Sequence, residues 1–163
     1  MKNPRLVILR GRPTSGKSTA WHSLRKRKEL KDWVFIDFCD MKETMGKEKG
    51  KAALFEKLKD AMASGKNIMI EEMSKETLGK YIGDEISEFG YEIVVFQFTV
   101  STETAYKRDV QRAKDKWHPF MGKKLIDELH EYHDKKIDEE GTLVDCDKLG
   151  KKEVVDLILS KLV

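Results

Sequence analysis

Residues 11–19 read Gly-Arg-Pro-Thr-Ser-Gly-Lys-Ser-Thr and match the phosphate-binding pattern G-x-x-x-x-G-K-[ST] at every position. The apolar run Leu6–Leu9 precedes the motif, and a helix-compatible stretch, Ala20–Leu30, follows it. A strand before and a helix after are the context this motif requires, because loop amides and the helix N-terminus then converge on a phosphate. The motif therefore predicts binding of a nucleoside triphosphate.

Individual residues of the motif have expected roles. Gly11 and Gly16 let the backbone turn tightly and approach a ligand without a Cβ atom in the way. Lys17 is expected to reach the β- and γ-phosphates, and Ser18 is expected to hold a magnesium ion. Nucleotide contacts are expected from all nine residues: Gly11, Arg12, Pro13, Thr14, Ser15, Gly16, Lys17, Ser18 and Thr19.

Length and composition indicate a single globular domain over residues 1–163 with a heavily charged surface. The net charge is +3, from 32 basic and 29 acidic residues, which is too balanced to indicate a nucleic-acid partner by itself. Cys39 and Cys146 form no C-x-x-C pair, and no apolar stretch approaches the length of a membrane span. We therefore expect a cytoplasmic protein with no membrane contact.

Apolar runs alternate with helical stretches along the chain, a pattern typical of a parallel sheet covered by helices. The expected strands are residues 5–10, 33–38, 67–71, 91–100 and 142–146. The expected helices are residues 17–30, 51–63, 75–89, 102–114, 123–137 and 151–162. In the fifth helix, residues recur at helical spacing in a stripe that is more often core than cofactor site: Leu125, Leu129, Tyr132 and Lys136, with Ile126 and Ile137 beside them.

Two carboxylates follow the second strand, where side chains of a parallel α/β sheet face the ligand. Asp40 is interpreted as the base that takes the proton of an attacking hydroxyl, and Asp37 as support for magnesium. These two roles are exchangeable at this level of the argument. The alternative is that one of the two carboxylates caps the following helix.

Glu71 and Glu72 follow the third strand, at a position that normally supports a magnesium ion. Adjacent strand residues point to opposite faces, so only one of the two can face the site. The pattern leaves open which one does.

Arg108 and Arg112 follow the fourth strand and share one helix face, as expected for a lid that closes over phosphates. The alternative is a solvated basic helix. His130 and His133 lie three residues apart, but no third ligand has suitable spacing, so we expect surface or partly buried residues and no metal site.

These features resemble small P-loop kinases, above all the kinase domain of phage-type polynucleotide 5′-kinases, with chloramphenicol phosphotransferase and zeta-toxin kinases as related groups. The resemblance covers nearly the whole chain and rests on residues 11–19, the acid after the second strand, Ile68–Glu72 and the stretch 105–112. It implies the P-loop kinase fold, an α/β structure with a five-stranded parallel sheet between helices and a helical lid at about 108–122.

The same resemblance implies an activity: transfer of the γ-phosphoryl group of ATP, with Mg²⁺, to the 5′-hydroxyl of RNA or DNA. Asp40 then takes the position of the general base, Lys17 and Arg112 act on the transferring phosphate, and Arg108 and Arg112 bind ATP. Glu72 falls where those kinases carry an aspartate.

Two further functions stay open. Polynucleotide kinases place an arginine shortly after the base, and here only Lys42 stands near that place, followed by Glu43. This departure favours a small-molecule kinase acting on an antibiotic, a sugar or a nucleotide-sugar. A non-catalytic nucleotide-dependent switch is the third reading, although paired acids and lid arginines serve no purpose in a simple binder.

Overall fold

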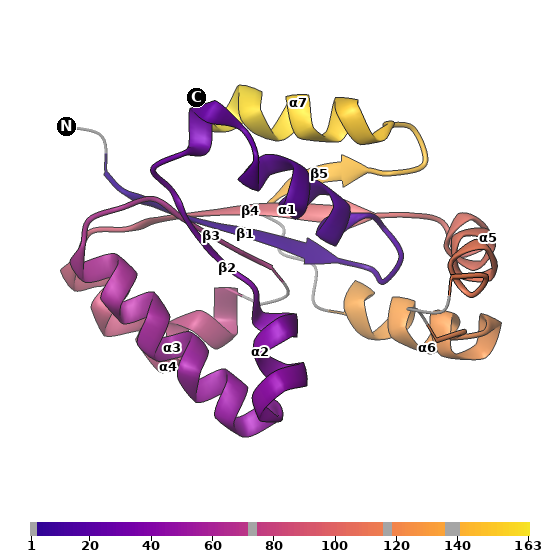
Figure 1. Ribbon diagram of the computed structural model, residues 1–163, viewed down its shortest axis with the longest axis horizontal. Coiled ribbons are helices and arrows are strands. Elements are labelled where there is room, and N and C mark those ends of the chain that lie inside the picture. The colour runs from indigo at the N-terminus through magenta and orange to yellow at the C-terminus, as the bar shows by residue number, and fades with distance from the viewer. Residues whose placement is uncertain (1–2, 72–74, 116–118, 136–140) are drawn as a thin grey trace.

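The computed structural model describes residues 3–71, 75–115, 119–135 and 141–163 (Figure 1). Its five strands form one sheet, and every strand pair is parallel. The order is β2-β3-β1-β4-β5, so the strand that precedes the phosphate-binding motif lies at the centre. The strands are β1 (Arg5–Gly11), β2 (Val34–Ile36), β3 (Ile68–Glu71), β4 (Glu92–Thr99) and β5 (Thr142–Asp145).

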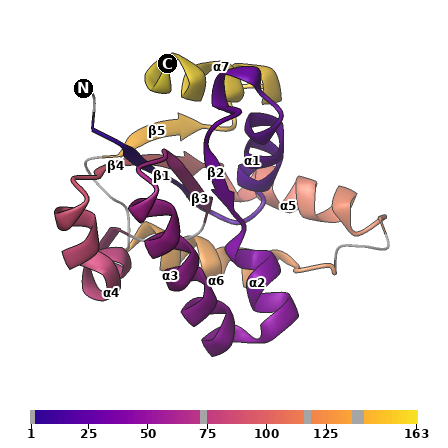
Figure 2. The same ribbon diagram turned by 60° about the vertical axis from the view of Figure 1, so that its left-hand side comes forward.

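Helices cover both faces of the sheet and one end of it (Figures 1 and 2). One layer contains α1 and α7, the opposite layer contains α3 and α4, and α5 and α6 lie beyond the carboxyl ends of the central strands. The helices are α1 (Lys17–Arg25), α2 (Phe38–Met45), α3 (Lys47–Ala63), α4 (Lys75–Glu88), α5 (Thr102–Arg112), α6 (Lys123–Asp134) and α7 (Lys151–Leu162), with a short 3₁₀ turn at Lys28–Leu30.

Alternation along the central strand divides the core in two. Val7 and Leu9 pack in the cluster with α1 and α7, and Leu6 and Ile8 pack in the cluster with α3 and α4. All four side chains are fully buried. A strand buried on both faces needs an apolar residue at every position, which is why this stretch reads as a continuous apolar run.

The fold class expected from the sequence is confirmed, and each expected strand and helix is present, most of them with shifted ends. The second strand was expected to reach residue 38 but ends at Ile36. The side chain of Asp37 caps the next helix, so the backbone leaves the strand there and α2 begins at Phe38. This short helix was not expected.

Two expected helices also need correction. The first was expected to reach residue 30, but α1 ends at Arg25, and a separate 3₁₀ turn follows. In α6, Leu125 and Tyr132 are exposed, whereas Ile126 and His130 are buried. The expected stripe is therefore wrong for Leu125 and Tyr132, and the core-facing side is the one of Ile126, which was expected beside the stripe. Apolar residues on both sides of the helix make its amphipathic pattern ambiguous.

In the described parts of the chain, no helix combines the length and the apolar character needed to cross a bilayer.

Candidate active site

The loop between β1 and α1 has the backbone shape that its glycines allow. Gly11 has a φ of 137° and Gly16 a φ of 98°, values that side-chain-bearing residues rarely adopt. A Cβ atom on Gly11 would lie 2.0 Å from the carbonyl oxygen of Phe98 on β4. Thr14 also has a positive φ, of 60°. The loop thus packs against β4 while turning sharply into α1.

Lys17 lies at the start of α1 with its side chain folded back into this loop. Its Nζ donates to the carbonyl oxygens of Gly11 and Arg12, at 3.0 Å each, and the residue is buried. The loop therefore holds an ammonium group at its centre. Phosphate oxygens that enter the loop can replace these carbonyl contacts with stronger charge-assisted ones.

A cleft of about 830 Å³ opens beside the loop, within the size range of small-ligand sites. Its floor is formed by residues 13–20, and α5 contributes Arg108, Gln111 and Arg112. Its other end is formed by the β5–α7 loop and the start of α7: Cys146, Leu149, Gly150, Lys151 and Val154. Burial raises the pKa of the Cys146 thiol to about 11, so this end presents a neutral sulfur. The cleft therefore joins a cationic floor to a largely apolar end.

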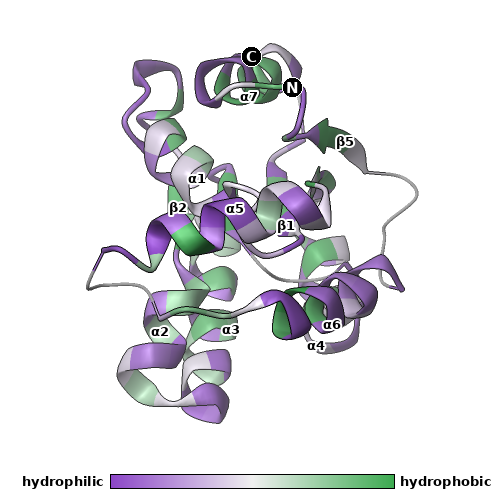
Figure 3. Ribbon diagram, turned by 90° about the vertical axis from the view of Figure 1, so that its right-hand side faces the viewer, coloured by the Kyte–Doolittle hydropathy of each residue, from purple (hydrophilic) through white to green (hydrophobic). Residues whose placement is uncertain are grey.

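Arg108 and Arg112, which share one face of α5, both line the cleft. Arg108 connects the two ends of the cleft, because its guanidinium donates hydrogen bonds to the carbonyl oxygens of Thr14 (3.1 Å) and Cys146 (2.9 Å). Arg112 is exposed at the mouth. Figure 3 looks at this end of the molecule, with α5 in front of β1 and coloured mainly hydrophilic.

Asp109 on α5 holds Met121 and Gly122, the two residues that precede α6. Its buried carboxylate accepts hydrogen bonds from the main-chain amides of Met121 (3.1 Å) and Gly122 (2.9 Å). Of the lid expected at 108–122, the helical part ends at Arg112. Residues 121–122 are therefore tied to α5 by contacts between a side chain and the backbone.

Of the two acids after the third strand, Glu71 is among the described residues. Glu71, the last residue of β3, is 3% exposed, and its Oε2 lies 3.4 Å from the hydroxyl of Ser18, which donates to it. Its side chain therefore lies at the start of α1. Glu72 lies outside the described residues.

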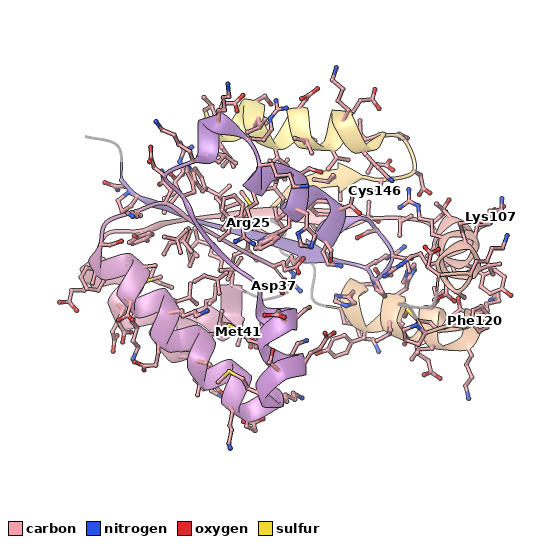
Figure 4. All side chains as sticks on the ribbon, in the orientation of Figure 1. Arg25, Asp37, Met41, Lys107, Phe120 and Cys146 are labelled. Carbon is pink, nitrogen blue, oxygen red and sulfur yellow. The ribbon has the colours of Figure 1, made fainter. Side chains whose placement is uncertain are left out.

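Asp37 marks the point where β2 meets α2 (Figure 4). Its Oδ1 accepts a hydrogen bond from the amide of Asp40 at 3.0 Å, so of the two acids Asp37 is the helix cap. One oxygen of Asp37, the sulfur of Cys39 and one oxygen of Glu71 lie within 4.8 Å of one another. Together with the Ser18 hydroxyl, these carboxylates form a set of oxygen donors suited to Mg²⁺.

Asp40 lies in the first turn of α2, is exposed and does not line the cleft. The structure therefore gathers Lys17, Ser18, Arg108 and Arg112 around the cleft. It places Glu71 beside Ser18, and Asp37 beside Glu71. It does not place Asp40 in the lining of the cleft.

Arg12 is directed away from the cleft, although the sequence grouped it with the nucleotide contacts. Its guanidinium binds the carboxylate of Asp134 on α6 and the carbonyl oxygen of Val100. Any nucleotide contact from this position must come from its backbone. The chain offers no local signal for this pair, because 122 residues separate the two partners.

His130 was expected at the surface or partly buried, but it is only 3% exposed. Its Nδ1 lies 3.4 Å from the hydroxyl of Thr102. Burial and the nearby Arg12 charge lower the pKa of His130, so the neutral ring is favoured. The sequence also missed His22 and Asp115, which line the cleft, because neither belongs to a recognisable motif.

No family model matches the chain, and no curated protein matches it. Solved structures are similar at low sequence identity. The tunicamycin resistance protein of Deinococcus radiodurans has a TM-score of 0.66 and 13% identity, with 98% of this chain and 95% of that chain covered. A gluconokinase from Sinorhizobium meliloti has a TM-score of 0.62 and 17% identity, with 99% and 93% covered.

A chain of the Pnkp1/Rnl/Hen1 RNA repair complex has a TM-score of 0.60 and 22% identity. The match covers 86% of this chain and 48% of that one, so this chain spans about half its length. At these identities the likenesses establish the fold, which this chain shares with the gluconokinase and the other two proteins.

Proposed function

We propose that this chain is an ATP-dependent kinase that transfers the γ-phosphoryl group to a hydroxyl acceptor. The observation that carries this proposal is the cleft, where Lys17 and two arginines, Arg108 and Arg112, surround a phosphate-binding loop. A protein that only binds a nucleotide needs the loop but not the two arginines. The arginines on a separate helix suit a reaction in which charge spreads over the transferring phosphoryl oxygens.

The residues of the cleft divide between binding and transfer. The apolar end at Cys146, Leu149 and Val154 accepts a nucleobase, and the loop amides with Lys17 hold the phosphates. Arg112, at the cleft mouth, stabilises the charge that develops during transfer. Catalysis here is mainly positioning and electrostatics, because phosphoryl transfer needs little covalent chemistry from the protein.

The oxygen donors beside the loop fit a magnesium ion. Ser18 and Glu71 would hold it, with Asp37 supporting them. Bound there with the nucleotide, Mg²⁺ would supply positive charge that offsets the negative charge of the phosphates during transfer.

We assign the base role to Asp40. Asp37 already accepts the amide of Asp40 as a helix cap, so one of its oxygens is occupied. Asp40 is one helical turn further on and exposed, and it is accessible to an acceptor that approaches along α2. It would accept or orient the proton of the attacking hydroxyl.

For the acceptor we propose the 5′-hydroxyl of RNA or DNA. The support is the resemblance of the loop, the acids and the lid stretch to polynucleotide 5′-kinases, together with the similarity to a chain of an RNA repair complex. A small-molecule acceptor is the second candidate. It is favoured by the lysine, in place of an arginine, at position 42 and by the full-length similarity to a gluconokinase.

The test is to incubate the protein with γ-labelled ATP, Mg²⁺ and a panel of 5′-hydroxyl oligonucleotides and small alcohols. We expect label on an oligonucleotide, with an acceptor KM that rises steeply with salt because phosphate contacts release counterions. Label on a small neutral alcohol, with little salt dependence, selects the second candidate. ATP binding without label on any acceptor points to the non-catalytic switch.

The matched variants are Arg112→Ala and Lys107→Ala, on the same helix. Lys107 lies on the outer side of α5 (Figure 4) and forms an exposed ion pair with Glu103. We expect Arg112→Ala to lose at least about a hundredfold in kcat and Lys107→Ala to stay near wild type. If the two variants had the same kcat, Arg112 would have no role in the reaction.

A further inference from the structure

We propose that Asp134 on α6 is a positioning residue for the phosphate-binding loop: through Arg12 it ties the loop to α6 and so to the lid segment. The inference rests on the proposed function, because it assumes that this loop holds a triphosphate. Asp134 touches neither the cleft nor the reacting atoms, so its effect passes through Arg12.

The contact between the two side chains is a forked ion pair. Arg12 Nη2 donates to Asp134 Oδ1 (2.7 Å) and Oδ2 (2.6 Å), and Arg12 Nε donates to Oδ1 (2.9 Å). Arg12 Nη1 donates to the carbonyl oxygen of Val100 at 2.8 Å. A planar guanidinium held on two sides has one orientation, so it fixes direction as well as distance.

The backbone of Arg12 belongs to the nucleotide site itself. Its amide donates to the carbonyl oxygen of Phe98 at 3.3 Å, and its carbonyl oxygen accepts from Lys17 Nζ at 3.0 Å. Two residues later, Thr14 adopts a positive φ that a non-glycine residue keeps only when its surroundings hold it there. A rotation at Arg12 would therefore move both the lysine contact and the strained part of the loop.

The other end of the tether is the helix that follows the lid. Met121 and Gly122 donate their amides to Asp109 on α5, and α6 begins at the next residue, Lys123. Figure 1 shows α5 and α6 packed together beyond the carboxyl end of β1. A continuous series of contacts thus runs from the lid helix through Asp109, α6 and Asp134 to Arg12.

The exposure of the pair separates this role from a purely structural one. The side chains of Arg12 and Asp134 are 23% and 43% exposed, so solvent screens the pair and its contribution to folding is small. Meanwhile α6 is anchored independently by the buried residues Ile126 and His130. Loss of the pair should therefore leave the fold intact and affect the loop.

The test compares Asp134→Ala with Asp127→Ala. Asp127 lies on the same helix and forms an exposed pair with Lys123 at 2.7 Å. The ATP dissociation constant is measured by calorimetry without acceptor, and KM for ATP, kcat and the melting temperature are measured beside it. We expect about tenfold weaker ATP binding in Asp134→Ala, with KM rising more than kcat falls, and wild-type values in Asp127→Ala.

Two further variants show whether the effect passes through Arg12. Asp134→Glu keeps the charge and should recover most of the affinity. The double variant Arg12→Ala/Asp134→Ala should lose no more than the single variants, because both changes remove one contact.

Wild-type ATP affinity in Asp134→Ala, even with a lowered melting temperature, overturns the inference, and so do additive losses in the double variant. Absence of ATP binding by the wild-type protein overturns the proposed function instead. The two failures are therefore distinguishable.

Discussion

Asp37 and Asp40 stand three residues apart in the chain but have different surroundings. The carboxylate of Asp37 is joined to the α2 backbone and lies beside Glu71, whereas Asp40 is exposed on the first turn. The two predicted roles can therefore be separated by substitution, because an asparagine keeps the capping oxygen and loses the charge.

We expect Asp37→Ala to lower the free energy of unfolding by about 1 kcal/mol, whereas Asp37→Asn should retain the cap and most of the stability. Asp40→Asn should keep the stability and the ATP affinity but reduce kcat at least about a hundredfold. Denaturant titration, calorimetry and the labelled-ATP assay measure the three quantities. A normal kcat in Asp40→Asn would transfer the base role to Asp37.

At the scale of elements, α2 is held by a close approach to α3. The two helices meet at Gly50 of α3, where a Cβ atom would lie 2.8 Å from the carbonyl oxygen of Met41 on α2. Only glycine allows this distance. Because α2 carries Asp40, the approach also sets the position of the proposed base.

Gly50→Ala should destabilise the protein by about 1–3 kcal/mol through overpacking, although alanine is the better helix former. The matched control is Gly79→Ala in α4, where the added Cβ meets nothing within 4 Å and φ is not positive. This control should raise stability by roughly 0.5–1 kcal/mol. Urea unfolding of both variants measures the difference, and equal stabilisation by both would contradict the close packing of α2 on α3.

The burial of His130 makes the stability of the folded protein depend on pH. Since the pKa of His130 is lowered by burial and by Arg12, the unfolded chain binds a proton more readily than the folded one. Stability should be fully present above the unfolded pKa of about 6.5 and should fall as the pH drops below it. The measurement is the urea midpoint between pH 7.5 and pH 5.

His130→Asn should remove much of this loss, because an amide can contact Thr102 without titrating. His22→Asn, a change at an exposed histidine, is the control and should keep the wild-type pH dependence. An unchanged midpoint between the two pH values in the wild-type protein would contradict the burial of a neutral ring.

At the scale of the whole molecule, the cleft gathers segments from the two ends of the chain. The loop after β1, helix α5 and the start of α7 all line it. A ligand in the cleft therefore contacts elements from residue 13 to residue 154 and should stabilise the fold as a whole.

We expect ATP with Mg²⁺ at about a hundred times its dissociation constant to add roughly 2.7 kcal/mol to the free energy of unfolding. For a chain of this size the melting temperature should rise by roughly 5–10 °C. AMP, which lacks the β- and γ-phosphates, should raise it less, and Lys17→Ala should lose most of the ATP effect. Equal shifts with AMP and ATP would contradict the assignment of Lys17 to the outer phosphates.

Local sequence determined the glycine-rich loop after β1, the strands and the described helices other than α2, and the shared face of Arg108 and Arg112, because each depends on residues that are close in the chain. Gly11 and Gly16 act through backbone geometry, Lys17 donates to the same loop from its side chain, and a strand buried on both faces needs its own apolar run. The shared helix face of Arg108 and Arg112 likewise follows from their spacing.

Tertiary packing alone decided the rest. It placed Glu71 beside Ser18, turned the buried side of α6 to Ile126 and His130, and directed Arg12 to Asp134. Each of these outcomes depends on which surfaces meet in three dimensions. Periodicity and spacing describe one segment at a time, so they carry no information about a partner that lies 122 residues away.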